Sequence, residues 1–173
     1  MIRILKQIFR TGIVTEPVQP EAAMDMQEFG PRLESVIRER FRGSLAIRQV
    51  DAGSCNGCEL EIHAINNTFY NCEQYGIHFT ASPRFADLLL VTGPVSRNME
   101  IALRRTYDAT PTPKLVVALG DCGCNGGVFG TSYASLGGVS SVIPVNACIP
   151  GCPPQPAAIL AGIMALLENK ENR

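Results

Sequence analysis

The sequence predicts an α/β domain built on a parallel, doubly wound sheet, and three features of the chain predict it. From residue 43 onward, segments with the character of strands alternate with segments of helical periodicity. Two of the strand segments, residues 86–92 and 114–119, are almost wholly apolar, as expected for strands that a parallel sheet buries on both faces. The chain has 173 residues, which suffices for one domain with a substantial core.

The first strand is the clearest alternating segment, since residues 44–51 (SLAIRQVD) alternate apolar and polar side chains. Residues 120–138 are rich in glycine and have no clear period. The predicted strands are residues 44–51, 76–81, 86–92, 114–119 and 142–145, and the predicted helices are residues 59–69, 98–107 and 156–170. Because strands that alternate with helices pair in parallel, the predicted fold is a flavodoxin-like doubly wound sheet with an N-terminal helical extension.

Residues 1–43 are predicted to be this extension, and residues 44–173 the α/β domain. Residues 15–23 contain two prolines and indicate an extended linker between two helical pieces. The second piece, residues 31–41, has one apolar stripe and many charges elsewhere. The first piece has apolar residues at helical spacing with basic residues between them, namely Ile2, Leu5, Ile8 and Phe9 with Arg3, Lys6 and Arg10. We expect the extension to contact partner subunits or a membrane surface; the alternative is that the second helix packs on its own domain.

The composition excludes several classes of function. The net charge is −1 and the aromatic fraction 6%, with no tryptophan, which argues against a nucleic-acid-binding protein. Charged residues make up only 18% of the chain, so we expect partner subunits to cover part of its surface. The longest apolar stretch, residues 157–167, is shorter than the roughly 20 residues that span a bilayer. No secretory or twin-arginine signal is visible, so the reducing cytosol is the expected compartment.

The chain contains seven cysteines, which is many for its size. In a reducing cytosol structural disulfides are not expected, and metal or redox chemistry becomes the leading explanation. Six of the cysteines follow predicted strands in pairs: Cys55 and Cys58, Cys122 and Cys124, and Cys148 and Cys152. Ligands of open α/β sheets bind at the carboxyl ends of the strands, so the fold brings these pairs together. Cys72 lies after a helix and is interpreted as a small buried apolar residue.

Glycines and prolines surround these cysteines. Glycine lets the backbone approach a bulky cofactor and point amide N–H groups at it, which an iron–sulfur cluster requires. A four-cysteine zinc site usually has two local C-x2-C pairs, and this chain has only the pair Cys55 and Cys58. Spacing therefore favours a cluster but leaves zinc open, and it does not choose four ligands among the cysteines. No cysteine has a local histidine partner for nucleophilic catalysis, and His63 is interpreted as a packing or hydrogen-bonding residue.

Three motifs occur in order along the α/β domain: CNGCE at residues 55–59, GDCGCNGG at 120–127 and PGCPP at 150–154. Together they resemble the small subunit of nickel–iron hydrogenases and the related cluster-bearing subunit of respiratory complex I, over about residues 45–167. The resemblance implies one proximal 4Fe–4S cluster. Its four ligands would be Cys55, Cys58, Cys122 and Cys152. The resemblance assigns no role to Cys124 or Cys148.

The spacing of the first two cysteines separates the branches of this family. The complex I subunits carry them adjacent to one another, whereas two residues lie between Cys55 and Cys58, as in hydrogenases. Neither an export signal nor a second cysteine-rich domain is visible in this sequence, and we therefore expect it to be most similar to the energy-converting, membrane-bound hydrogenases of the formate hydrogenlyase type. The resemblance implies an oxidoreductase subunit that passes electrons to a nickel–iron centre in a partner large subunit for proton reduction to hydrogen. The alternative is the equivalent subunit of a complex I-like quinone- or sulfur-reducing oxidoreductase.

The resemblance also implies partners: the hydrogenase large subunit, ferredoxin-like iron–sulfur subunits and integral membrane subunits. It implies a peripheral location on the cytoplasmic side of the cell membrane, with no transmembrane helix in this chain. Two acidic residues lie beside the expected ligands. Glu59 is a candidate proton relay, or else a first-turn acid that the helix dipole stabilises. Asp121 could tune the potential of the cluster or cap a turn, and we expect the turn.

Overall fold

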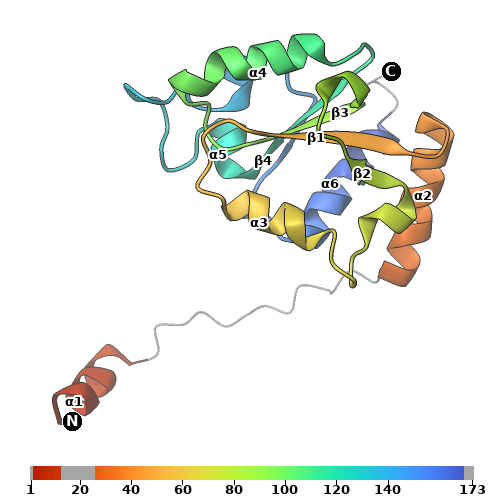
Figure 1. Cartoon of the computed structure of the whole chain (residues 1–173). Helices are drawn as coiled ribbons and strands as arrows, with labels where there is room; N and C mark the ends of the chain where they lie inside the picture. The colour runs from red at the N-terminus through yellow and green to blue at the C-terminus, as the bar shows by residue number, and fades with distance from the viewer. Residues whose placement is uncertain (1, 13–25, 170–173) are drawn as a thin grey trace.

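The computed structural model describes residues 2–12 and 26–169, and at its centre lies a five-stranded sheet in which every strand pair is parallel (Figure 1). The strands run in the order β2-β1-β3-β4-β5, the doubly wound order expected from the sequence. Their bounds are Leu45–Asp51 for β1, Ile77–Phe79 for β2, Leu88–Thr92 for β3, Leu115–Leu119 for β4 and Ala147–Ile149 for β5. The chain winds from β1 to β2 on one side and then returns to β3 on the other, so the winding reverses between β1 and β3.

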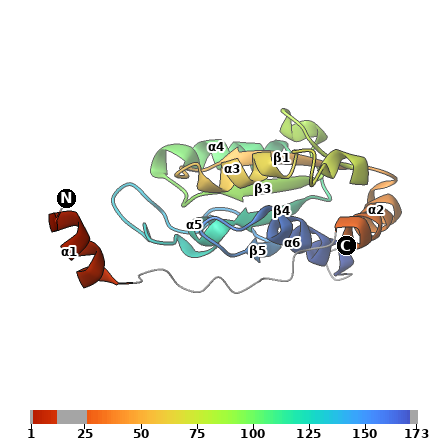
Figure 2. The ribbon, with the colours of Figure 1, turned by 90° about the horizontal axis from the view of Figure 1, so that it is seen from below.

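Helices cover both faces of the sheet (Figures 1 and 2). Helices α2, α3 and α6 pack on one face, where they share a core with Leu45, Ile47 and Leu90. Helix α4 covers the other face, where its Leu103 is fully buried against Leu89 and the strands around it. The helices are α1 (Ile2–Thr11), α2 (Met26–Phe41), α3 (Gly57–Ala64), α4 (Arg97–Ala109), α5 (Gly120–Asn125) and α6 (Pro156–Glu168), with short 3-10 turns at Cys72–Tyr75, Pro83–Phe85 and Val139–Ser141.

The last strand lies later in the chain than predicted. We predicted a strand at residues 142–145, but β5 is Ala147–Ile149. Pro144 has no backbone N–H to give to a ladder. Pairing with β4 begins instead at Asn146, whose backbone N–H donates to the Val116 carbonyl (2.8 Å) while its side-chain oxygen accepts from the Val116 N–H (2.8 Å).

The helix after the first strand is also shorter than predicted, because α3 ends at Ala64 rather than at residue 69. Asn67 follows this end, and its side-chain oxygen accepts hydrogen bonds from the N–H groups of Phe69 and Tyr70. An asparagine that bonds the backbone in this way forms a turn that competes with the helix.

The second helix of the extension packs on its own domain. Leu33 and Ile37 of α2 are completely buried against the sheet and α6. Gly30 of α2 lies so close to the Tyr75 ring that a Cβ there would be 2.1 Å from it. Of the two alternatives considered for this helix, the structure therefore shows packing within the chain. The predicted linker, residues 15–23, lies outside the described residues.

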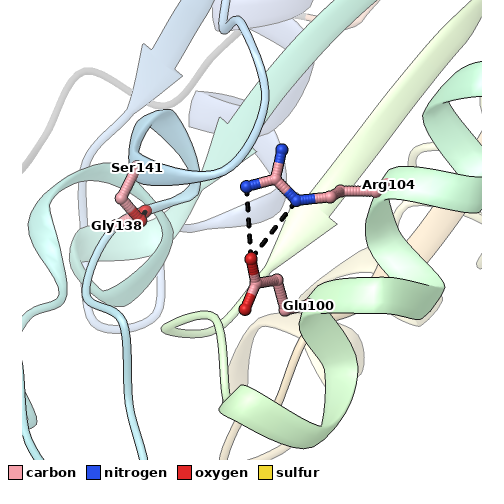
Figure 3. Close-up of polar contacts among 4 residues, drawn as sticks. All are labelled: Glu100, Arg104, Gly138 and Ser141. Carbon is pink, nitrogen blue, oxygen red and sulfur yellow. Dashed lines mark hydrogen bonds and ion pairs between the residues drawn. The ribbon is translucent and has the colours of Figure 1, made fainter.

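The exposed side of α4 carries an ion pair. Figure 3 shows Arg104 reaching back one turn to Glu100, with its Nε at 3.3 Å and a terminal nitrogen at 3.2 Å from one carboxylate oxygen. An exposed pair at this spacing contributes only about 0.3–0.5 kcal/mol. In the same figure the Ser141 hydroxyl closes a turn by donating to the Gly138 carbonyl (2.6 Å).

Across the described residues, 2–12 and 26–169, no helix is long and apolar enough to pass through a bilayer.

Candidate metal centre

A small cavity of about 110 Å³ lies at the carboxyl edge of the sheet, and four cysteines line it. They come from the segments after three strands: Cys55 and Cys58 after β1, Cys122 after β4 and Cys152 after β5. Gly93, directly after β3, completes the wall. Because the winding reverses between β1 and β3, the cavity lies at the point where doubly wound sheets bind their ligands.

The loop after β1 is fixed by its own polar groups. The Asp51 carboxylate accepts hydrogen bonds from the N–H groups of Gly53 (2.8 Å) and Ser54 (2.7 Å). Asn56 has a left-handed backbone (φ 72°), which turns the chain directly into α3. Cys58 therefore lies in the first turn of α3, and Cys55 lies in the loop before it.

Two glycines allow the other loops to approach these thiols. Gly120 has a φ of 78°, and a Cβ at this position would lie 2.6 Å from the Cys58 sulfur. Gly127 has a φ of 52°, and a Cβ there would lie 2.8 Å from the Cys122 sulfur. Only glycine combines these backbone conformations with such close sulfur contacts.

The loops that carry Cys122 and Cys152 are joined by Asp121. Its carboxylate accepts a hydrogen bond from the Gly151 N–H (2.8 Å), and its own N–H donates to the Gly151 carbonyl (2.9 Å). The expectation that Asp121 caps a local turn is therefore wrong. Its partner lies 30 residues away, on the neighbouring ligand-bearing loop.

The four thiols influence one another electrostatically. Burial, the charge of Glu59 and the other three cysteines together raise the pKa of Cys58 to about 12. Burial, Cys152, Cys55 and Asp121 also raise the pKa of Cys122. The raised pKa values of Cys58 and Cys122 disfavour their thiolate forms, and a bound metal centre would offset this cost because it coordinates the thiolates.

The donor set and the space between the donors fit an iron–sulfur cluster. Four cysteine thiolates are the usual ligands of a 4Fe–4S cluster. Here the four cysteines line one cavity. Among residues 2–12 and 26–169, no group of three His, Cys, Asp or Glu side chains forms a ready site for a metal ion. Cys55 and Cys152 are exposed, so the cavity reaches the surface of this chain.

Glu59 lies behind the ligand loops and does not line the cavity. Its side chain is only 5% exposed, and the Thr92 hydroxyl at the end of β3 donates a hydrogen bond to its Oε1. Its second oxygen, Oε2, is buried and has no hydrogen-bond partner within the described part of the chain.

The three remaining cysteines have structural surroundings. Cys72 is fully buried in the core, and its thiol donates to the Asn66 side-chain oxygen (3.0 Å). Cys124 and Cys148 form a disulfide that links α5 to β5. The expectation of no structural disulfide is therefore wrong for this pair. The expectation rested only on the reducing conditions of the cytosol. In the fold, Cys124 of α5 and Cys148 of β5 lie at a Cα–Cα distance of 5.5 Å, at which a disulfide can form.

Sequence reasoning missed Gly93 and Ser54 as parts of the site. Gly93 has a φ of 76°, and a Cβ there would lie 2.5 Å from the Ser54 backbone nitrogen, so the loops after β1 and β3 touch at this point. The signal was the dipeptide Gly93-Pro94 directly after an apolar strand, which marks a sharp turn. His63 is exposed on α3, where it lines a separate surface hollow with Arg48.

The comparison with known families agrees with this geometry. The model of the family "NADH ubiquinone oxidoreductase, 20 Kd subunit" matches residues 55–166, a range that contains all four cavity cysteines. The chain belongs to this family. The resemblance predicted from the three motifs is confirmed, and homologues in the 20 kDa subunit family include hydrogenase subunits.

Several curated proteins are similar to this member of the 20 kDa subunit family. Formate hydrogenlyase subunit 7 of Escherichia coli (strain K12) is 39% identical over 150 residues, which cover 85% of this chain and 59% of that protein. The probable membrane-bound hydrogenase subunit mbhJ of Pyrococcus furiosus is 44% identical over 140 residues, covering 79% and 84%. One NADH-quinone oxidoreductase subunit, from Desulfovibrio desulfuricans, is 45% identical over 116 residues, covering 66% and 63%. The chain thus spans less than two thirds of the length of the first and third of these relatives.

Solved structures with the same fold come from two kinds of complex. A chain of the membrane-bound sulfane sulfur reductase, an archaeal respiratory membrane complex, matches with a TM-score of 0.65 and 33% identity, over 82% of this chain and 77% of that one. A chain of the NAD+-reducing [NiFe]-hydrogenase matches with a TM-score of 0.57 and 19% identity, over 72% and 91%. The second likeness supports the fold alone. The first structural match and the curated relatives agree with membership of the 20 kDa subunit family.

Proposed function

We propose that this chain is the electron-transfer small subunit of a membrane-bound nickel–iron hydrogenase complex, and that Cys55, Cys58, Cys122 and Cys152 hold one 4Fe–4S cluster. When bound, the cluster supplies one-electron transfer between ferredoxin-like subunits and the nickel–iron site of a partner large subunit, where protons are reduced to hydrogen. The observation that carries the proposal is the cavity lined by these four thiols at the switch point of the sheet.

Residues around the four cysteines would position the cluster and shape its surroundings. Gly120 and Gly127 let the backbone approach the sulfurs, and Asp121 keeps two of the ligand loops in register. A second hollow of about 380 Å³, lined partly by Cys122, Cys152 and Val128, adjoins the cavity. Val128 is 93% exposed, and Phe129 and Tyr133 of the same loop are also exposed. We place the large subunit on this apolar surface, where it would shield the cluster from water.

Glu59 is the residue proposed as a proton relay. A carboxyl buried beside a ligand loop, with one oxygen free of protein partners among the described residues, has the chemistry to take and give a proton. Glu59→Gln retains an acceptor for Thr92 and removes the exchangeable acid. In the assembled complex it should lower hydrogen production at least tenfold with unchanged iron content. Normal hydrogen production by this variant would contradict the relay and would mean that Glu59 has a structural role only.

The test of the cluster is metal analysis after anaerobic purification. We expect about four irons and four acid-labile sulfides per chain, with no zinc. Cys55→Ala and Cys152→Ala should abolish cluster assembly, whereas Cys72→Ala should preserve it. Zinc near one equivalent without acid-labile sulfide would show a zinc-stabilised interaction module instead.

A second candidate is the equivalent subunit of a complex I-like sulfur- or quinone-reducing oxidoreductase. The match to the sulfane sulfur reductase complex favours sulfur reduction, and two residues between Cys55 and Cys58 argue against quinone. The co-purified large subunit separates the two functions. If that subunit lacks cysteine pairs for nickel and the complex evolves no hydrogen, the second candidate holds.

A further inference from the structure

Helix α1 carries exposed apolar side chains at both ends and in its middle. Ile2, Leu5 and Phe9 follow one another at helical spacing, and their side chains are 82%, 51% and 85% exposed. Ile4, which is 64% exposed, widens the stripe. Large apolar side chains that face water do little to stabilise a helix of ten residues. A stripe of them therefore indicates a surface that another molecule covers in the working protein.

A basic stripe runs beside the apolar one. Arg3, Lys6 and Arg10 have the same spacing as the apolar residues, displaced by one position, which turns them by about 100° around the helix axis. Their side chains line one shallow surface depression together with Gln7 and Thr11. The sequence of α1, IRILKQIFRT, contains no acidic residue, so nothing within the helix neutralises these three cations.

Helix α2, which packs on the α/β domain, provides a comparison for α1 within the same chain. Its apolar residues Leu33 and Ile37 are completely buried, and its basic residues alternate with acids, as in the Arg38–Glu34 ion pair (2.5 Å). Helix α1 has neither property. A protein groove could bury its apolar stripe but would have to provide a separate acid for each cation, whereas an anionic lipid surface accepts both stripes along the whole helix.

We propose that α1 is an interfacial helix that binds an anionic bilayer surface. A helix of ten residues is about 15 Å long, which is half the thickness of the hydrocarbon core, so it lies in the plane of the interface and does not cross it. Ile2, Leu5 and Phe9 enter the acyl boundary, and the basic stripe meets the lipid phosphates. The proposal does not depend on the cluster, because it concerns only residues of α1.

Co-sedimentation of the full chain with vesicles tests this binding. We expect it to sediment with vesicles of phosphatidylcholine containing about a quarter phosphatidylglycerol, and less with phosphatidylcholine alone. Phe9→Ser should lower the partition coefficient about tenfold. Replacing Arg3, Lys6 and Arg10 together by Gln should lower it about a hundredfold and remove its dependence on salt.

Matched controls use exposed apolar residues of the α/β domain. Phe69 is 67% exposed and Phe85 74% exposed, and Phe69→Ser and Phe85→Ser should leave vesicle binding unchanged. Equal losses from these controls, or no binding of the unaltered chain to either vesicle, would overturn the proposal. It would also be overturned if the α1 variants bound vesicles normally but lost co-purification with other subunits, because the occupant of the stripe would then be a protein. Measuring the iron-free chain in parallel separates this result from the cluster hypothesis.

Discussion

Asp121 and Gly151 are joined by two hydrogen bonds in opposite directions, one through the Asp121 carboxylate (2.8 Å) and one through its backbone N–H (2.9 Å). Each residue directly precedes a cavity cysteine, Cys122 in α5 and Cys152 in the loop after β5. One side-chain and one main-chain hydrogen bond therefore hold together the two segments that carry these thiols, before any metal is bound. Such a contact keeps the loops arranged for a ligand and reduces the ordering that binding requires.

Asp121→Ala should loosen the site. It leaves the Gly151 N–H without its acceptor, and a partly buried donor that loses its partner costs about 1–2 kcal/mol. We expect the free energy of unfolding of the iron-free chain to fall by that amount. The loaded protein should lose iron to a chelator several times faster, which the decay of its visible absorbance measures.

Asp121→Asn is the matched variant, since it keeps a side-chain oxygen for the Gly151 N–H and removes the charge. Its iron release should match that of the unaltered chain. Release as fast as in Asp121→Ala would mean that the charge of Asp121, and not its hydrogen bond, stabilises the site.

Gly120→Ala should damage the loaded site more than the empty one. Gly130 is a suitable control, because it also has a positive φ (51°) but has nothing within 4 Å of its Cβ position, whereas a Cβ on Gly120 meets the Cys58 sulfur at 2.6 Å. Both variants should destabilise the iron-free chain by about 1–2 kcal/mol through backbone strain. A free thiol can rotate away from the new methyl group, but a metal-bound sulfur cannot. Iron content should therefore fall in Gly120→Ala alone, and equal iron contents in the two variants would contradict this reasoning.

Much of the fold could be predicted from the sequence, because the signals were local. The apolar runs at residues 86–92 and 114–119 became β3 and β4, and the alternating segment at 44–51 became β1. The strand predicted at 142–145 was wrong because β5 depends on a side chain: Asn146 pairs with Val116 of β4, and no periodicity signals such a contact.

The same distinction applies to the site, because part of it could be predicted from the sequence and part could not. Placing cysteines after strand ends predicted which loops meet, and the structure brings Cys55, Cys58, Cys122 and Cys152 around one cavity. The Asp121–Gly151 bonds and the contact of Gly93 with Ser54 could not be predicted, because they join segments distant in sequence through exact loop shapes.

The Cys124–Cys148 disulfide should stabilise the oxidised chain. The two residues are 24 positions apart, and closing a loop of that length restricts the unfolded chain by about 3 kcal/mol. Adding dithiothreitol to the iron-free chain should lower its melting temperature by about 6–12 °C. A variant with both Cys124→Ala and Cys148→Ala should show no such response and should retain its iron. Loss of iron from this double variant would mean that one of the two cysteines is a ligand.

Thr92→Val should destabilise the protein through Glu59. The Thr92 hydroxyl donates to a carboxylate that is only 5% exposed and whose other oxygen is buried without a hydrogen-bond partner in the described structure. Valine keeps the shape of threonine but removes the hydrogen bond to Oε1, so that neither oxygen of Glu59 has a donor in the described structure. We expect the free energy of unfolding to fall by about 1–3 kcal/mol. Thr92→Ser retains the hydroxyl and removes only a methyl group, so it should lose about 1 kcal/mol. Chemical unfolding of the iron-free chain measures both. If the valine variant is at least as stable as the serine variant, the hydroxyl is not what stabilises Glu59 in its buried position.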